Sequence, residues 1–361
     1  MRQFKRIVFV AVAIAALTVG SPASARSATR VVHPGESIQA AVDASAPGDT
    51  VLVKAGEYYE SVAIHTNGLT LKAQGEVTLE PSHYGSSECY IPGHDVGICV
   101  VPADFNPSSG TYTTRVSDIT ITGFHIVGFQ GDGVFGFGTL NLTVSQVVAT
   151  DNAAYGIASF DGIGTAFTRN AVSGSHDAGI YVGDSLTANA VVSHNRSWGN
   201  ALGILVRHSQ KALVSDNELW GNCIGVFLLA DGQAGGSGQT DVSNNTVYTN
   251  NEVCTQFANA GFLPVLGGGG IVLAGSKRNV LFQNVVRDNR GSTLFSGGIV
   301  LVATPRANLD GSFDASINNL VFLNRLSGNE PADIVNDAAS TPNLIVGNRC
   351  NTSMPGGLCG F

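Results

Sequence analysis

Charged residues are scarce in this chain, at 13% of 361 residues, and long apolar runs are scarcer still. Beyond the first 25 residues, no segment offers the roughly 18 consecutive apolar residues that a membrane-spanning helix needs. Runs of the helix-forming residues Leu, Glu and Lys are also few, whereas the chain has 45 glycines. This composition argues against a protein of long helices and is typical of a turn-rich β protein.

The long apolar stretch at the N-terminus has the features of a secretory signal. Basic residues at positions 2, 5 and 6 precede an apolar run from Ile7 to Val19, and Ala-Ser-Ala follows at 23–25. This order predicts a signal peptide over residues 1–25 and a secreted protein. Its removal changes the formal net charge from −8 to −11. Such a charge argues against nucleic acid and membranes as partners, and against an anionic polysaccharide unless a cation or a local basic patch reverses the field.

The chain lacks any Cys-x-x-Cys pair, so its six cysteines favour disulfides over a metal site in an exported protein. Six cysteines allow 15 connectivities. Proximity in the sequence favours the pairs Cys89–Cys99 and Cys350–Cys359, which leaves Cys223 for Cys254. The second local pair would close a C-terminal tail over residues 350–361.

Short apolar strands that follow a glycine recur along the chain. They begin at Gly133, Gly156, Gly179, Gly203 and Gly225, in steps of 22 to 24 residues, and continue at Gly270 and Gly298 after steps of 45 and 28. A repeat of this length without helical periodicity predicts one coil of a parallel β-solenoid. The longer steps indicate insertions.

Asparagines end a second series of Val-rich strands. They are Asn170, Asn195, Asn217, Asn245, Asn284, Asn324 and Asn348. An asparagine stacked on its counterpart one coil away satisfies side-chain amides and turn backbone groups that would otherwise be buried without partners. This series is therefore expected to belong to the scaffold.

The segment "GESIQAAVDASAPGDTVLVKAGEYYESVAI" and the recurring "N…GN..GI.V" units resemble the right-handed parallel β-helix repeat proteins. That superfamily includes pectate lyases, polygalacturonases and alginate epimerases. The resemblance implies an all-β, single-domain right-handed parallel β-helix with a short capping helix at "SIQAAVDAS". Ile38, Ala41 and Val42 fall on one face of such a helix, which agrees with this. We expect the cap over residues 26–48 and the β-helix over 49–349.

Side chains alternate along each strand, so Ile180 and Val182 should point into the core and their neighbours outward. The outward positions form what we call the aromatic stripe: Phe135, Phe137, Phe160, Tyr181, Leu205, Arg207, Phe227 and Leu229. One interpretation is that a loop covers the stripe as a second core. The other is that it is exposed and stacks sugar rings, with Phe135, Phe160, Tyr181 and Phe227 as binding residues.

Polar residues follow the same strands, five or six positions after each glycine: Asp161, Asp184, His208 and Asp231, with Arg207 beside them. Carboxylates one coil apart could divide the roles of acid and nucleophile or base, and Arg207 could hold an anionic or hydroxyl group. Ordinary turn chemistry explains aspartates here equally well.

Before the strand at Gly179 stand His176 and Asp177, a possible general-base dyad or simply a surface histidine. Adjacent residues of an extended chain point opposite ways, so only one of them should face the stripe. Inserted loops are expected at 81–115, 230–240, 253–268 and 303–315, as walls beside the stripe.

The catalytic motifs of the related enzymes are absent: no Gly-His-Gly with a later Arg-Ile-Lys, no Asp-Pro-His-Asp, and no pectate-lyase arginine motif. The favoured hypothesis is a secreted polysaccharide lyase or hydrolase acting on an extracellular polysaccharide, as a monomer. A non-catalytic glycan-binding β-helix is the alternative, and a metal-insertion accessory protein a weaker one, since the chain has two methionines. No cofactor is certain, Ca²⁺ stays possible, and no metal ligand is identified.

Overall fold

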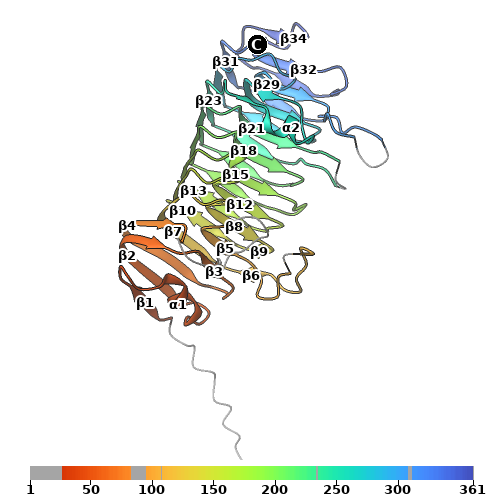
Figure 1. Ribbon diagram of the computed structural model, residues 1–361. Coiled ribbons are helices and arrows are strands. Elements are labelled where there is room, and N and C mark those ends of the chain that lie inside the picture. Colours follow the sequence, from red (N-terminus) through yellow and green to blue (C-terminus); the bar gives the residue numbers. More distant parts are fainter. Residues whose placement is uncertain (1–26, 83–94, 107, 233–234, 308–310, 361) are drawn as a thin grey trace, which may run out of the picture.

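The computed structural model describes residues 27–82, 95–106, 108–232, 235–307 and 311–360. These residues form a parallel β-helix, whose coils stack from β1 and α1 at one end to β34 at the other (Figure 1). Two helices occur in the described part of the chain, and both are short. None of them is long and apolar enough to cross a membrane. The expected all-β solenoid is confirmed.

The first sheet contains eleven strands in sequence order and carries all seven glycine-led strands that the sequence predicted. They are β3 (Val62–Ile64), β5 (Ile98–Val100), β8 (Val134–Phe137), β12 (Ile157–Phe160), β15 (Ala178–Gly183), β18 (Leu202–Arg207), β21 (Ile224–Leu229), β26 (Gly269–Ala274), β29 (Gly297–Val302), β32 (Ile334–Asn336) and β34 (Ser353–Met354). We call this the front sheet.

The second large sheet has nineteen strands. It begins with β1 (Thr29–Val32) and three long strands, β2 (Thr50–Tyr59), β4 (Thr70–Glu80) and β7 (Thr120–Val127). After β7 it divides into two ladders, which give each later coil a triangular section. One ladder is β10 (Thr143–Ser145), β13 (Ala166–Thr168), β16 (Val191–Ser193), β19 (Leu213–Ser215), β22 (Asp241–Ser243), β27 (Val280–Phe282), β30 (Leu320–Phe322) and β33 (Leu344–Val346). The other is β11 (Val148–Thr150), β14 (Ala171–Ser173), β17 (Arg196–Trp198), β20 (Glu218–Trp220), β23 (Thr246–Tyr248), β28 (Val285–Arg287) and β31 (Arg325–Ser327).

Two small pairs lie outside these sheets. β6 (Val116–Ser117) pairs with β9 (Thr139–Leu140), and β24 (Val253–Cys254) pairs antiparallel with β25 (Leu266–Gly267). Between β24 and β25 lies the second helix, α2 (Gln256–Asn259). This excursion projects from the front sheet (Figure 1).

The first coil is closed by the capping helix α1 (Ile38–Asp43). Ser37 caps it, because its hydroxyl oxygen accepts a hydrogen bond from the backbone N–H of Ala40 at 3.1 Å. Ile38 and Val42 are buried and Ala41 packs against the same core, so the predicted apolar face is confirmed. The helix thus shields apolar side chains that an uncapped solenoid would expose.

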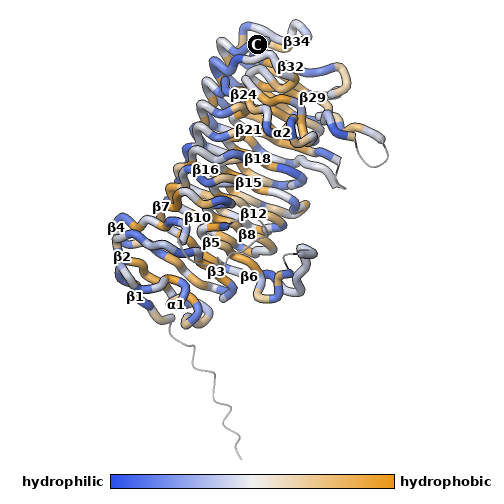
Figure 2. The backbone as a smooth tube through the Cα atoms, viewed as in Figure 1, coloured by the Kyte–Doolittle hydropathy of each residue, from blue (hydrophilic) through white to orange (hydrophobic). Residues whose placement is uncertain are grey.

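The interior is a continuous column of aliphatic side chains. Ile180 and Val182 of β15 lie in it, as do Ile204 and Val206 of β18, and all are at most 2% exposed. Alternating apolar and polar stretches are visible along the tube in Figure 2. The predicted inward direction of these residues is confirmed.

The predicted asparagine series forms an internal ladder. The side-chain nitrogen of each member donates to the side-chain oxygen of the next, from Asn170 to Asn348, at 2.9–3.0 Å. A second ladder, which the sequence analysis did not identify, contains Asn200, Asn222, Asn250, Asn289 and Asn329 and ends on Asp333. All these side chains are buried, so the two ladders provide the polar groups at two corners with partners.

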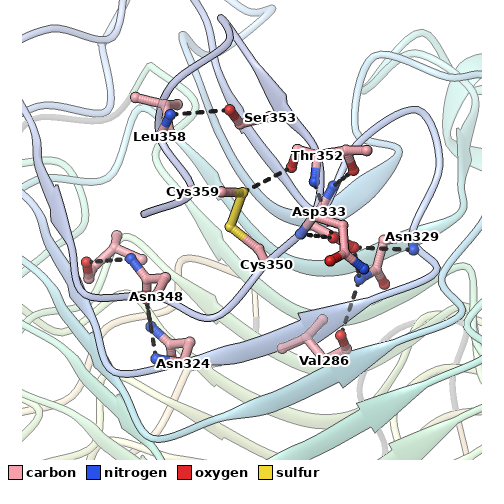
Figure 3. Close-up of a disulfide and its surroundings, with 12 residues drawn as sticks. Val286, Asn324, Asn329, Asp333, Asn348, Cys350, Thr352, Ser353, Leu358 and Cys359 are labelled. Atoms are coloured by element: carbon pink, nitrogen blue, oxygen red, sulfur yellow. Dashed lines mark hydrogen bonds between the residues drawn. A yellow bond between two sulfur atoms is a disulfide. The ribbon is translucent and has the colours of Figure 1, made fainter. Parts of the chain in front are cut away.

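The disulfides Cys223–Cys254 and Cys350–Cys359 are confirmed, with Cα atoms 6.0 and 5.3 Å apart. Figure 3 places the second beside the end of both asparagine ladders. Cys89 and the predicted signal peptide lie outside the described residues, so the pair Cys89–Cys99 stays a prediction.

Candidate active site on the front sheet

The aromatic stripe lies on the outer face of the front sheet, but it is covered. Tyr181 and Phe227 are 0% exposed, Leu205 is 5% and Phe135 is 7%. Over Tyr181, Leu205 and Phe227 the cover comes from the excursion around α2, where Phe257, Phe262, Leu263 and Leu266 pack on the stripe, together with Phe295. Phe135 belongs to a separate cluster, in which it packs with Val96, Val101 and Phe105.

The interpretation of Tyr181, Phe227 and Phe135 as an exposed sugar-stacking platform is therefore wrong. A contiguous apolar face of this size is more stable when a loop removes it from water, and here the chain supplies that loop itself. Phe160 is partly exposed, and its ring packs between Phe135 and Tyr181, with centroids 5.3 and 4.5 Å away.

A small pocket remains between the stripe and the α2 excursion. Its volume is about 180 Å³, and its walls are mostly apolar. The polar groups in its lining are Asp177, Tyr155 and Arg207. This volume is below the roughly 300–1,000 Å³ of most ligand pockets, so it fits one small ring at most.

His176 and Asp177 diverge, as the extended backbone predicts. Asp177 lines the pocket with Arg207, whereas His176 is exposed and lines a separate hollow beside the Cys223–Cys254 disulfide. The two side chains therefore do not form a dyad over the stripe. Gln256 of α2 donates to the His176 carbonyl at 2.9 Å, which helps to hold the excursion in place.

Beside the pocket, four of the candidate catalytic residues meet in one ionic cluster. Arg207 Nε and Nη2 donate to the two carboxylate oxygens of Asp231, each at 2.9 Å. His208 contacts Asp231 through Nε2 and lies 3.2 Å from an Asp184 oxygen through Nδ1. The Asp231 side chain is 0% exposed and that of His208 is 2%, whereas Asp184 is 31% exposed. Asp184 is thus the most exposed of these four side chains.

The cluster sets the charges of its own members. Burial opposes charge on both Asp231 and His208, but their mutual hydrogen bond and charges outweigh it. The pKa of Asp231 is lowered, with help from Arg207, and the pKa of His208 is raised, with help from Asp184. The raised pKa favours the protonated form of His208, which lies between the carboxylates of Asp184 and Asp231.

Asp161 occupies the equivalent position one coil earlier but has other partners. Arg115 Nη2 donates to its carboxylate at 2.9 Å, and the Tyr112 hydroxyl donates to the other oxygen. Asp161, Asp184 and His208 all have left-handed backbones, with φ of 47°, 57° and 47°. Asp and His tolerate this conformation better than most residues, so the same turn recurs in successive coils. The side chain of Asp161 is 32% exposed.

Segments expected to be loops supply residues at this site. Tyr112 and Arg115 contact Asp161, Phe262 lies 4.9 Å under the Arg207 guanidinium, and Arg306 approaches Asp231 at 3.8 Å. Sequence reasoning did not identify Tyr112, Arg115, Phe262 or Arg306. Nothing in their local sequence marks them, because only tertiary folding brings them to the front sheet.

Asp132 is a further buried acidic group, two residues before β8 of the front sheet. It is 6% exposed and accepts a hydrogen bond from the backbone N–H of Tyr155 at 2.9 Å. Burial raises its pKa to about 7, and the nearby charge of Asp177 adds to the effect. Ionised Asp132 therefore costs the folded state free energy.

Asp132→Asn should make the protein more stable at pH 8 than the wild type, by a few kcal/mol at most, because one pKa unit is worth about 1.36 kcal/mol. The raised pKa of Asp132 contributes to the free energy of unfolding of the wild type. This contribution is complete below pH 3.8, the ordinary pKa, and is lost as the pH rises to about 7. The two proteins should hence unfold alike near pH 4. Urea unfolding at both pH values tests this, with the exposed Asp151→Asn as control. An equal difference at both pH values would contradict it.

Within the described ranges, no group of three or more His, Cys, Asp or Glu side chains could hold a metal ion.

A model of the right handed beta helix region matches residues 132–313, half of the chain. The chain belongs to this family. No curated protein sequence matches it. Among solved structures, a mannuronan C-5 epimerase A-module from Azotobacter vinelandii has a TM-score of 0.62 at 18% identity, covering 86% of this chain and 90% of the module.

Two other solved structures that are similar to this chain are enzymes with different names. A DFA-IIIase from Arthrobacter chlorophenolicus has a TM-score of 0.54 at 13% identity, over 85% of this chain and 89% of its own. An alginate lyase from a Paenibacillus species has a TM-score of 0.51 at 14% identity, over 90% and 99%. Identities this low establish the common fold alone.

Proposed function

We propose that this β-helix is a secreted enzyme that cleaves an extracellular polysaccharide by hydrolysis, with Asp161 and Asp184 as the paired carboxylates. The observation that carries the proposal is their placement. They occupy the same position of adjacent coils, both are about one-third exposed, and each is held by its own cationic neighbour. The structurally similar epimerase, lyase and DFA-IIIase support a carbohydrate substrate. The disulfides support a location outside the cytoplasm.

The coil geometry favours a retaining reaction. The backbone N–H of Asp161 donates to Gly183, directly before Asp184, at 2.9 Å. Adjacent strands are spaced by about 4.8 Å, and retaining glycosidases place their carboxyl groups about 5–5.5 Å apart. One carboxylate would attack the anomeric carbon while the other, protonated, donates to the leaving oxygen. Water then releases the glycosyl intermediate.

Arg207 makes elimination the less favoured reaction. A lyase neutralises the substrate carboxylate with a cation, but the donors Nε and Nη2 of Arg207 already bind Asp231. The expected role of Arg207 as a substrate clamp is replaced by a positioning role, in which Arg207 and Asp231 fix His208, and His208 fixes Asp184.

Purified protein incubated with neutral and uronic-acid polysaccharides tests the proposal, with both reducing ends and ultraviolet absorbance of new double bonds recorded. Hydrolysis predicts new reducing ends without new double bonds. The appearance of new double bonds would contradict hydrolysis and show that the enzyme cleaves by elimination. Retention of a polymer on an affinity gel without cleavage would favour the non-catalytic binding protein instead.

A further inference from the structure

A groove of about 570 Å³ lies far from the front sheet, at the corner where β27, β30 and β33 turn into β28 and β31. In Figure 1 the labels β23 and β31 mark this flank, and α2 lies on the other side of the solenoid. The volume falls within the range of ordinary ligand sites. None of its eight lining residues is acidic, and two are the arginines Arg325 and Arg349.

Arg325 and Arg349 are neighbours on adjacent coils. They form a parallel bridge, and the Arg349 N–H donates to the Asn324 carbonyl at 2.9 Å. Like charges directly opposite each other in adjacent strands are unfavourable. Among the described residues neither guanidinium has an ion pair or a hydrogen bond. An anion between them would remove this repulsion.

The acidic residues that follow β28 and β31 do not fill that role, because they are engaged with other arginines. Asp288 pairs with Arg287 and Arg290 at 3.3 and 3.1 Å, and Glu330 approaches Arg290 at 3.8 Å. In a chain with a formal net charge of −8, two unpaired arginines in one groove form a local basic patch. Such a patch reverses the field that otherwise argues against an anionic polymer.

The rest of the lining suits a sugar. Asn244 and Gln283 present side-chain amides that make no hydrogen bond within the described structure, and these can bind hydroxyl groups. Leu323 is 54% exposed and offers an apolar surface for the C–H face of a sugar ring. Asn244, Gln283 and Leu323 occupy the same corner of successive coils. In the next coil this position is Gly347, which has no side chain and so leaves the groove open.

We propose that this corner groove binds a uronic-acid segment of the polysaccharide substrate, with a carboxylate between Arg325 and Arg349. Planar guanidinium groups bind carboxylates through paired, charge-assisted hydrogen bonds. The inference rests on the proposed function for its polymeric ligand, and it narrows that ligand to an acidic one. The groove anchors the polymer on the flank opposite α2 and takes no part in the reaction.

Calorimetric titration with a galacturonic acid hexamer tests this, with cellohexaose and sodium sulfate as the neutral and the inorganic probes. The double variant R325Q/R349Q should bind the acidic hexamer about tenfold more weakly or worse, because hydrogen bonds to charged groups are worth about 1.5–3 kcal/mol. Arg169→Gln is the matched control, since Arg169 is an exposed corner arginine without an ion pair in the described structure, five coils before Arg325. It should bind like the wild type.

Unchanged binding by a folded double variant would overturn the proposal, as would displacement of the hexamer by an equal concentration of sulfate, which would mark a general anion site. Asp184→Asn separates the two proposals, because it should bind the hexamer normally. Groove binding without any cleavage refutes the proposed hydrolysis alone. Cleavage with unchanged binding in the double variant refutes the groove alone.

Discussion

Asp184→Asn should lower the rate of polysaccharide cleavage by about a hundred- to ten-thousandfold, the range lost when a general acid or base is removed. Asn has the shape of Asp and still accepts the hydrogen bond that Tyr181 donates at 3.2 Å. It cannot attack carbon or exchange a proton at neutral pH. Since Asp184 is partly exposed, the free energy of unfolding should change by less than about 1 kcal/mol.

Two companion variants make this result specific. Asp161→Asn should cause a similar loss of rate, because a retaining reaction needs both carboxylates. Asp216→Asn should have no effect, although Asp216 has the same left-handed backbone, with φ of 58°, at another corner. Full activity of Asp184→Asn would place the reaction elsewhere on the molecule, even with the fold unchanged.

Asp231→Ala should destabilise the protein by about 3–5 kcal/mol, because it leaves two buried cationic groups without their partner. The Arg207 side chain is 19% exposed and that of His208 is 2%, so water cannot fully replace the lost carboxylate. Asp241→Ala is the control: Asp241 is exposed on β22, and its loss should cost at most about 0.5 kcal/mol. Chemical denaturation at neutral pH measures both.

The pH dependence of the stability deficit shows whether the loss of charge interactions causes it. The lowered pKa of Asp231 contributes stability that is complete above its ordinary value of 3.8 and is lost as the pH falls through the folded value. The raised pKa of His208 contributes stability below its ordinary 6.5 that is lost as the pH rises through the folded value. The deficit of Asp231→Ala should therefore be largest between about pH 4 and 6.5. A deficit independent of pH would point to lost packing instead.

Residues that point inward were predictable from the sequence. Strand periodicity placed Ile180 and Val182 correctly, and the recurrence of Asn170, Asn195 and their successors predicted one ladder. The second ladder was also within reach, because Asn200 follows Asn195 by five residues and Asn222 follows Asn217 by the same spacing. Because each coil repeats the same geometry, a local sequence pattern is sufficient to predict which residues point inward.

Residues that point outward were not predictable in the same way. The alternation that directs Tyr181 and Phe227 away from the core is the same whether a loop covers them or not. Whether Phe262 reaches the stripe depends on how the α2 excursion folds back, and that fold has no repeat to follow. The bidentate contact of Arg207 with Asp231 joins residues 24 positions apart, one of them after the strand has ended.

The second asparagine ladder has a direction, and Asp333 ends it. In the side-chain bonds between its members, every asparagine donates to the next member on the C-terminal side and accepts from the N-terminal side, so each coil extends the donor–acceptor chain by one unit. Asp333 receives the donation from Asn329, and Figure 3 shows these two side chains together. The other oxygen of Asp333 accepts from the backbone N–H of Asn351 at 2.9 Å. An ionised carboxylate has no proton to pass on. Gene duplication could therefore lengthen this solenoid by copying an internal coil, whereas a coil added beyond Asp333 would inherit no donor from it.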